Sequence, residues 1–291
     1  PARAVGVRLL RETGAVVVET RTDDDGRFEL PHSLPFGTRV TVQARAEVVF
    51  AGHSGRVLDR RTGGGRVYAL ESPVFDVAAA ADVALLAQVG TGLGGAFNIV
   101  AMLYSAFVVY APHVGAAAPT LTVQWQAGLP WACSSCYGGN VISLGGQVED
   151  TDEYDDGIIL HEVGHYFVGH YSRDTSPGGS HRDRLVTPEH AYGEGLAYFF
   201  AAMVLGHALI VDTYIASNRI MDFEEVTLDG VSRIDFFGTS DGRVDGLLRE
   251  EIVAGVLWDA FDGPTATEPF DRVALGAAGV IRVLVDYFGT W

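Results

Sequence analysis

The chain has 291 residues, 48% of them hydrophobic, so it is long enough to bury one large core or to form two domains. Its formal net charge is −17, and residues 149–291 carry 26 acidic residues against nine Arg. Such an acidic surface repels phosphate groups, so neither nucleic acid nor a membrane is an expected partner. The chain has no Lys, and its composition is typical of a GC-rich bacterial genome.

Residues 5–70 contain short runs of β-forming residues separated by Gly, Pro and Asp turns. The spacing of these runs predicts a small antiparallel β-sandwich, which we place at residues 1–72. Within it, TDDDGRFEL predicts an Asp-rich turn that leads into a strand, and a solvated turn is favoured there over a calcium loop. The runs that predict strands are AVVVETR, GRFEL, TRVTVQARAEVVF and GRVYAL.

The pattern changes after Ser72-Pro73, where a second domain, residues 73–291, is expected to begin. Helical periodicity dominates from Asp155 onwards. The predicted class is therefore α+β, in which the small β-sandwich is followed by a mainly helical catalytic domain with a short sheet. Before Asp155 the pattern predicts DVAAAADVALLAQ as a helix, AFNIVAMLYSAFVVY as a helix followed by a strand, and TLTVQW and NVISLGG as short strands.

Residues 90–111 carry no charge and are long enough to cross a membrane. Their four glycines and the lack of basic flanking residues favour a buried helix instead.

The two cysteines, Cys133 and Cys136, are too few for a four-cysteine zinc site. They leave open a short-loop disulfide or a redox CxxC motif. A redox motif requires a strand-to-helix junction, whereas the flanking Trp131 and Tyr137-Gly138-Gly139 indicate a turn, so the redox role is the less favoured.

The stretch HEVGH, residues 161–165, matches the H-E-x-x-H pattern. Residues i and i+4 differ by about 40° around a helix, so His161 and His165 leave the same face one turn apart. Glu162 lies about 100° from His161, where it can reach a water on the metal without binding the metal. The alternative is a buried helix with hydrogen-bonded histidines, but it leaves a costly charge in an apolar run. We therefore expect two metal ligands and a catalytic base.

A catalytic zinc site needs a third protein ligand and an open fourth position. Glu194 is the favoured candidate, because it lies in a helix that Thr187-Pro188 begins, between Gly193 and Gly195. Glycines at these positions would let the helix approach a neighbour closely. The alternatives left open are His170, His181, Asp183 and His190.

HEVGH and the downstream GEGLAYFF together resemble gluzincin-type zinc metallopeptidases, over roughly residues 140–262. The gap between His165 and Glu194 is longer than in thermolysin or the aminopeptidases. Tyr198 stands four residues after Glu194, where thermolysin-like enzymes carry Asp. The resemblance implies one Zn²⁺ per chain, and NVISLGG as an edge strand that holds an extended substrate. EEIVAGVLWDAFD is interpreted as a core helix without chemistry.

The run from Thr22 to Phe28 resembles the carboxypeptidase regulatory-like (transthyretin-like) β-sandwich modules that are often attached to secreted enzymes. No signal-peptide pattern stands at the N-terminus, so the chain is either cytosolic or begins after processing. The module favours a secreted or cell-surface protein.

The expected reaction is hydrolysis of a peptide or protein substrate. Zinc held by His161, His165 and Glu194 activates a water, and Glu162 accepts its proton and returns it to the leaving amine. Two other functions remain open: a catalytically inactive binding protein with the same fold, and a zinc hydrolase of non-peptide amides. The candidate donors to the oxyanion are His181, Tyr171, Tyr192 and Tyr198.

Overall fold

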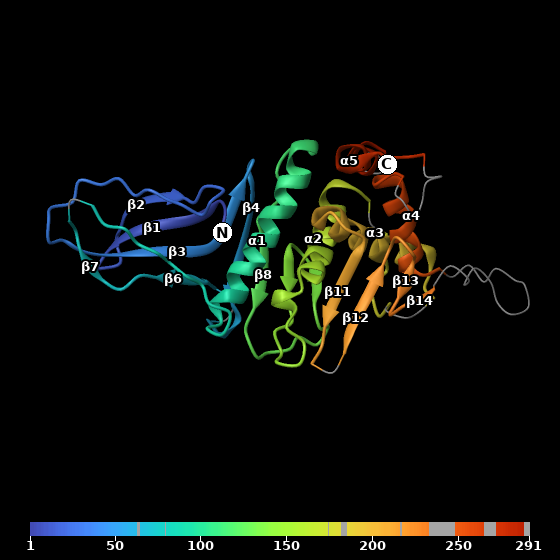
Figure 1. The fold of residues 1–291 in the computed structure, drawn as a ribbon, viewed down its shortest axis with the longest axis horizontal. Helices are drawn as coiled ribbons and strands as arrows, with labels where there is room; N and C mark the ends of the chain where they lie inside the picture. The colour runs from blue at the N-terminus through green and yellow to red at the C-terminus, as the bar shows by residue number, and fades with distance from the viewer. Residues whose placement is uncertain are drawn as a thin grey trace, which may run out of the picture.

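The computed structural model describes residues 1–291 except 63–64, 79, 174, 182–184, 216, 233–247, 265–271 and 288–291. Within the described residues the chain forms two β-sheets and five α-helices. Figure 1 shows an elongated molecule, with the N-terminal strands at one end and most of the helices at the other.

The larger sheet has ten strands and is mixed. Its main order is β2-β1-β3-β4-β8-β10-β9, while β5 pairs with β4, and β6 and β7 pair with β3. Strand β8 is parallel to both β4 and β10, whereas the other pairs are antiparallel. The strands are β1 Val5–Arg11, β2 Val16–Arg21, β3 Arg39–Phe50, β4 His53–Asp59, β5 Arg66–Val67, β6 Ala69–Glu71, β7 Phe75–Asp76, β8 Leu121–Trp125, β9 Cys136–Gly138 and β10 Val141–Ser143.

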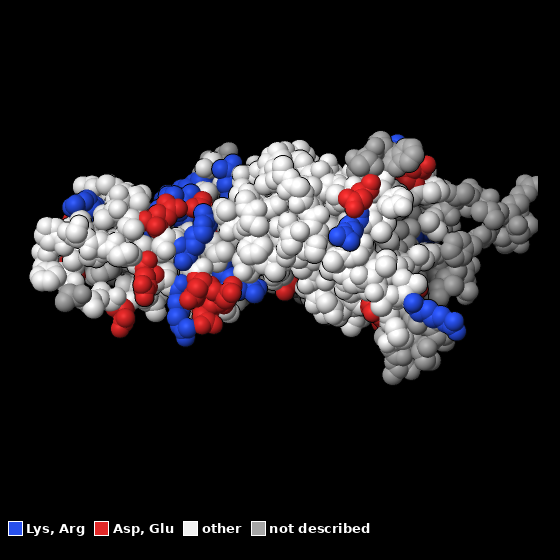
Figure 2. All heavy atoms as spheres, turned by 90° about the horizontal axis from the view of Figure 1, so that it is seen from above, with Lys and Arg blue, Asp and Glu red and all other residues white. Residues whose placement is uncertain are grey.

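Strand β3 forms the centre of the N-terminal part because its side chains alternate along twelve residues. Its polar side chains point outward. Arg45 pairs with Glu47 along the strand at 2.7 Å, and Gln43 donates a hydrogen bond across to Glu71 of β6 at 2.6 Å. Figure 2 shows basic and acidic side chains interspersed over this part of the sheet, whereas few charges lie above the neighbouring α1. The inward side chains of β3 are Val40, Val42, Ala44, Ala46 and Val48, all buried.

The predicted fold class is wrong, because one continuous ten-stranded sheet joins the N-terminal strands to β8, β9 and β10. The protein is mixed α/β, not a sandwich followed by a mainly helical domain. Strands β4 and β8, which lie on opposite sides of residue 72 in the sequence, pair from Gly55↔Leu121 to Asp59↔Trp125. The domain boundary placed at that residue stays a prediction.

Two segments predicted as regular structure are irregular. Residues 26–30 were expected as a strand and residues 76–88 as a helix. Apart from Asp76, which ends β7, neither segment is helix or strand where it is described. Both cover the apolar face of the N-terminal sheet, where Phe28, Val83 and Leu85 pack against the core. Burial alternates from residue 82 to 87, so this Ala-rich stretch lies extended; packing on the sheet has overridden its helix propensity.

Helix α1, Leu93–Tyr110, continues through the residues predicted to change into a strand. Its buried side chains follow helical spacing, and Leu103 packs so closely on β4 that a Cβ on Gly55 would lie 2.7 Å from it. This helix is the one described element that is apolar and long enough to cross a membrane, but 61% of its apolar stretch is buried, as in the core helix of a soluble protein.

Three helices in the second half of the chain pack closely: α3 lies against both α2 and α4. A Cβ on Gly164 of α2 would stand 2.8 Å from the Cα of Ala197 in α3. A Cβ on Gly195 of α3 would stand 2.5 Å from the backbone carbonyl oxygen of Glu250 in α4. Gly195 therefore permits the close approach expected of it. The helices are α2 Asp156–Tyr171, α3 Pro188–Leu205, α4 Glu250–Phe261 and α5 Gly276–Asp286.

A second sheet, antiparallel and in the order β11-β12-β13-β14, lies beside these helices (Figure 1). A Cβ on Gly157, in the first turn of α2, would lie 2.8 Å from Ile210 of β11. The short helix η3, Asp152–Tyr154, precedes α2. The strands are β11 Leu209–Thr213, β12 Asn218–Asp222, β13 Thr227–Leu228 and β14 Val231–Ser232.

NVISLGG was expected to provide an edge strand, and this is wrong. Its strand β10 lies between β8 and β9. Gly139 and Asn140 both have positive φ (58° and 67°), which fits a tight hairpin that turns β9 back onto β10. Cys133 and Cys136 form a disulfide at the start of this hairpin, with their Cα atoms 6.0 Å apart.

Candidate metal centre

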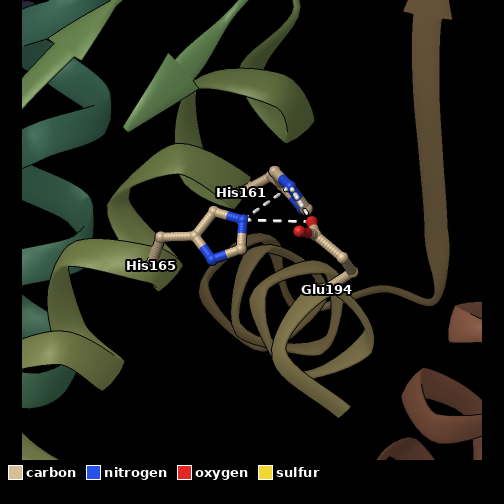
Figure 3. A group of neighbouring side chains, drawn as sticks. All are labelled: His161, His165 and Glu194. Carbon is tan, nitrogen blue, oxygen red and sulfur yellow. Dashed lines mark hydrogen bonds and ion pairs between the residues drawn. The ribbon is translucent and has the colours of Figure 1, made fainter. Parts of the chain in front are cut away.

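Helices α2 and α3 bring His161, His165 and Glu194 together, as Figure 3 shows. The two Nε2 atoms of the histidines are 3.1 Å apart. Glu194 Oε2 lies 3.1 Å from His165 Nε2 and 3.3 Å from His161 Nε2. The i,i+4 spacing in α2 aligns the two imidazoles, and the contact of α2 with α3 at Gly164 places the carboxylate against them.

These separations match the ligand set of a tetrahedral zinc site. Zinc binds His nitrogen and carboxylate oxygen at about 2.0–2.2 Å, so neighbouring ligand atoms in a tetrahedron stand about 3.3–3.5 Å apart. The three observed separations are within about 0.4 Å of that range. Two imidazoles and one carboxylate are also the donor types that zinc accepts at catalytic sites.

The protonation states of His161 and Glu194 suit metal binding. Burial lowers the pKa of His161 to about 3, so its ring is neutral at neutral pH and can offer a lone pair. Burial opposes ionisation of Glu194, but its hydrogen bonds with His161 and His165 outweigh this and hold its pKa well below the usual range. Glu194 is therefore a carboxylate beside two imidazoles.

The group is more open to solvent on one side. The side chains of His161 and Glu194 are 6% and 8% exposed, whereas those of His165 and His181 are 14% and 18% exposed. The group is therefore most accessible to solvent at these two histidines.

His181 and Glu250 form a second layer next to Glu194. His181 Nε2 is 3.4 Å from Glu194 Oε2, and its Nδ1 is 2.5 Å from Glu250 Oε2. The sequence interpretation missed Glu250, because it begins a helix interpreted as core. Its side chain is indeed buried, and only the folded chain shows that it faces a histidine.

Tyr198 supports the ring of His161. The two ring centroids are 4.0 Å apart. His161 Nδ1 is buried and has no hydrogen-bond partner among the described residues. The ring of His161 is therefore held by an aromatic contact with Tyr198, four residues after Glu194, and not by a carboxylate at that position.

The remaining sequence candidates lie at different distances from the group. Glu162 is 5% exposed, in the same turn of α2 as His161. His190 Nε2 is 3.6 Å from Glu194 Oε1, the oxygen that does not contact the histidine pair. His170 Nε2 instead contacts Asn140 Oδ1 at 2.5 Å. Asp183 lies outside the described residues.

Tyr171 does not take part in this group. Its hydroxyl accepts a hydrogen bond from the Ala118 N–H at 2.7 Å and lies 3.2 Å from His53 Nδ1. Of the four candidate oxyanion donors, His181 is the best supported, because its Nε2 lies 3.4 Å from Oε2 of the predicted ligand Glu194.

The chain matches no protein-family model, and no curated protein matches it. The structure itself establishes that buried His, Glu and Asp groups are arranged so that they could hold a metal ion.

Proposed function

We propose that this protein is a zinc-dependent peptidase of the gluzincin type. The observation that carries the proposal is the convergence of His161, His165 and Glu194, with donor atoms 3.1–3.3 Å apart. A purely structural zinc site is usually closed by four protein ligands, whereas three ligands with a more exposed side are typical of a catalytic site. The buried Glu162 beside His161 supplies the base that such a site needs.

The roles of the side chains follow from their positions. When zinc is bound, it polarises the attacking water and the scissile carbonyl. Glu162 accepts a proton from that water and returns it to the leaving amine. His181 Nε2, 3.4 Å from Glu194 Oε2, is placed to donate a hydrogen bond to the carbonyl oxygen as negative charge develops on it.

Glu250 positions His181 for this role. With Nδ1 donating to Glu250 Oε2 at 2.5 Å, the ring orientation is set and Nε2 faces Glu194. Because Nδ1 already donates to Glu250, Nε2 can donate only when the ring carries both protons.

The test is peptide cleavage by the purified chain together with its zinc content. We expect one zinc per chain by metal analysis and cleavage of a peptide library or casein. Glu162→Gln should keep the zinc and lower kcat by about 10²–10⁴-fold, because it removes the base and not a ligand. Glu189→Gln, an exposed change in the first turn of α3, is the matched control and should leave both unchanged.

Two outcomes would overturn the proposal. Zinc retained without cleavage of any peptide indicates a binding protein. Cleavage of non-peptide amides alone indicates another zinc hydrolase.

A further inference from the structure

Four buried aspartates converge near the N-terminal end of α2. They are distinct from His161, His165 and Glu194, which are called the His161 group below. Asp150 and Asp152 precede this helix, Asp155 is the residue before its first turn, and Asp212 lies in β11. Each is at most 4% exposed, and one carboxylate oxygen from each lies within 4.8 Å of those of the other three. The sequence interpretation placed Asp155 only at the start of the helical region and gave the others no role.

Neutral donors satisfy part of this group. Asp155 accepts hydrogen bonds from both the N–H and the hydroxyl of Thr213, each at 2.8 Å, and none from its own helix. The Ser135 hydroxyl donates to Asp152 Oδ2. Gln147 Nε2 donates to Asp150 Oδ2 at 2.9 Å. These bonds fix the carboxylates in place, but neutral donors do not cancel their mutual repulsion.

Asp150 gives an independent sign that something binds here. Its residue is 3% exposed, yet its Oδ1 has no hydrogen-bond partner among the described residues. The side-chain amide of Gln147 donates from Nε2 to the other oxygen of Asp150. Its Oε1 is also buried without a hydrogen-bond partner among the described residues. Buried oxygens of this kind are costly unless a donor or a cation satisfies them.

Asp152 is affected by the same crowding. Burial, followed by the charges of Asp150 and Asp212, raises its pKa to about 8 although Ser135 works in the opposite direction. A cation bound between these carboxylates would relieve the crowding.

We propose that Asp150, Asp152, Asp155 and Asp212 form a calcium site. All four donors are oxygens. Hard cations such as Ca²⁺ and Mg²⁺ prefer oxygen ligands, whereas zinc favours nitrogen and sulfur. Oxygens bound to one Ca²⁺ at about 2.4 Å lie at most about 4.8 Å apart. One carboxylate oxygen from each of the four aspartates lies within 4.8 Å of the others, so a single ion could contact all four. Mg²⁺ usually keeps several waters and uses one or two carboxylates, so four converging carboxylates favour calcium.

The position of the site gives it a structural consequence. Asp155 leads directly into α2, which carries His161 and His165, and Asp212 lies in the strand that follows α3, which carries Glu194. A cation bound by both would tie the two helices of the candidate metal centre together at one end. This inference does not depend on whether the His161 group binds zinc.

Terbium luminescence tests the proposal on the full chain, because Tb³⁺ replaces Ca²⁺ and is excited by nearby tyrosine. The Tyr214 hydroxyl donates to Asp212 Oδ2 at 3.2 Å, close enough to transfer energy. We expect sensitised emission that Ca²⁺ displaces at much lower concentration than Mg²⁺. We also expect the Tm of chelator-treated protein to rise by about 5–10 °C at free Ca²⁺ a hundredfold above its Kd.

Variants then locate the site. Asp150→Asn and Asp212→Asn should weaken Tb³⁺ and Ca²⁺ binding at least about tenfold, whereas Asp82→Asn, an exposed change on the irregular segment, should not. Circular dichroism verifies that each variant is folded, and the measurements on wild-type protein stand even where a variant does not fold. Absence of both emission and a calcium-dependent Tm in the wild type would overturn the proposal, as would equal binding by Asp150→Asn and Asp212→Asn.

Discussion

The two buried groups of ionisable side chains differ in their donors and in the structure that builds them. The His161 group combines two imidazoles with one carboxylate and is built from two regular helices. The second group, Asp150, Asp152, Asp155 and Asp212 (the Asp152 group), contains only carboxylates. They come from a loop residue, the short helix η3, the start of α2 and the strand β11. The first suits zinc chemistry and the second a hard cation. One helix, α2, links the two groups, so the proposed catalytic zinc and the proposed stabilising calcium would occupy separate sites on it.

The largest expected effect tests this separation directly. Glu194→Ala should remove the third ligand, abolish zinc retention and reduce cleavage at least about 1000-fold, since the activating ion is lost. Asp212→Asn should leave the zinc content unchanged and lower cleavage by less than about tenfold at temperatures where the variant is folded. Metal analysis and peptide cleavage on both variants measure this. Equal loss of zinc in both variants would show that the two groups act as one site.

A pH titration sharpens the comparison with a somewhat smaller effect. The pKa of Asp152 is raised to about 8 from 3.8 in the absence of a cation, so between these values the folded chain holds a proton that the unfolded chain has lost. The free energy of unfolding should therefore fall, by about 1 kcal/mol per pH unit, as the pH rises from 4 towards 8. Burial raises the pKa of Asp155 and of the neighbouring Glu153 as well, which acts in the same direction.

Urea denaturation of protein stripped with a chelator and reloaded with zinc measures this slope. Calcium should reduce it, because the bound ion stabilises the ionised carboxylates. Asp152→Asn should reduce it without calcium. A slope that neither change affects would mean that other groups dominate the pH dependence.

The smallest expected effect concerns the packing that forms the His161 group. Gly164→Ala places a Cβ 2.8 Å from the backbone of Ala197 and should destabilise the protein by about 1–3 kcal/mol while weakening zinc binding. Gly169→Ala is the control in the same helix, because the nearest atom would be 3.9 Å away, and it should stabilise by about 0.5–1 kcal/mol. Denaturant unfolding and zinc titration measure both. Similar effects of the two changes would show that the helix approach at Gly164 is unimportant.

Local patterns predicted those features that depend on a few neighbouring residues. The i,i+4 spacing in HEVGH, the start of α3 at Pro188, the strand β8 and the Asp-rich turn at Asp23, whose Oδ1 accepts from the Arg27 N–H at 2.8 Å, all agree with the structure. The sequence alternation also located much of β3. In each case backbone geometry over one or two turns is sufficient, so no distant partner is needed.

Long-range pairing was beyond these patterns. The ten-stranded sheet depends on β4 meeting β8, more than sixty residues later, and no local signal names a strand's partner. The stretch DVAAAADVALLAQ has helix-forming composition. It lies extended because, in that conformation, its apolar side chains cover the apolar face of β1 and β3, which would otherwise be exposed.

By itself, the sequence determined the two aligned histidines, the glutamate adjacent to the first of them, and a glycine-flanked glutamate that needed a close neighbour. Only the tertiary structure decided that Glu194 meets those histidines, that Glu250 faces His181, and that Asp212 joins three aspartates from another part of the chain. The physical reason is that a helix sets angles and distances within its own turns, whereas the contacts between elements depend on how their apolar faces are buried together.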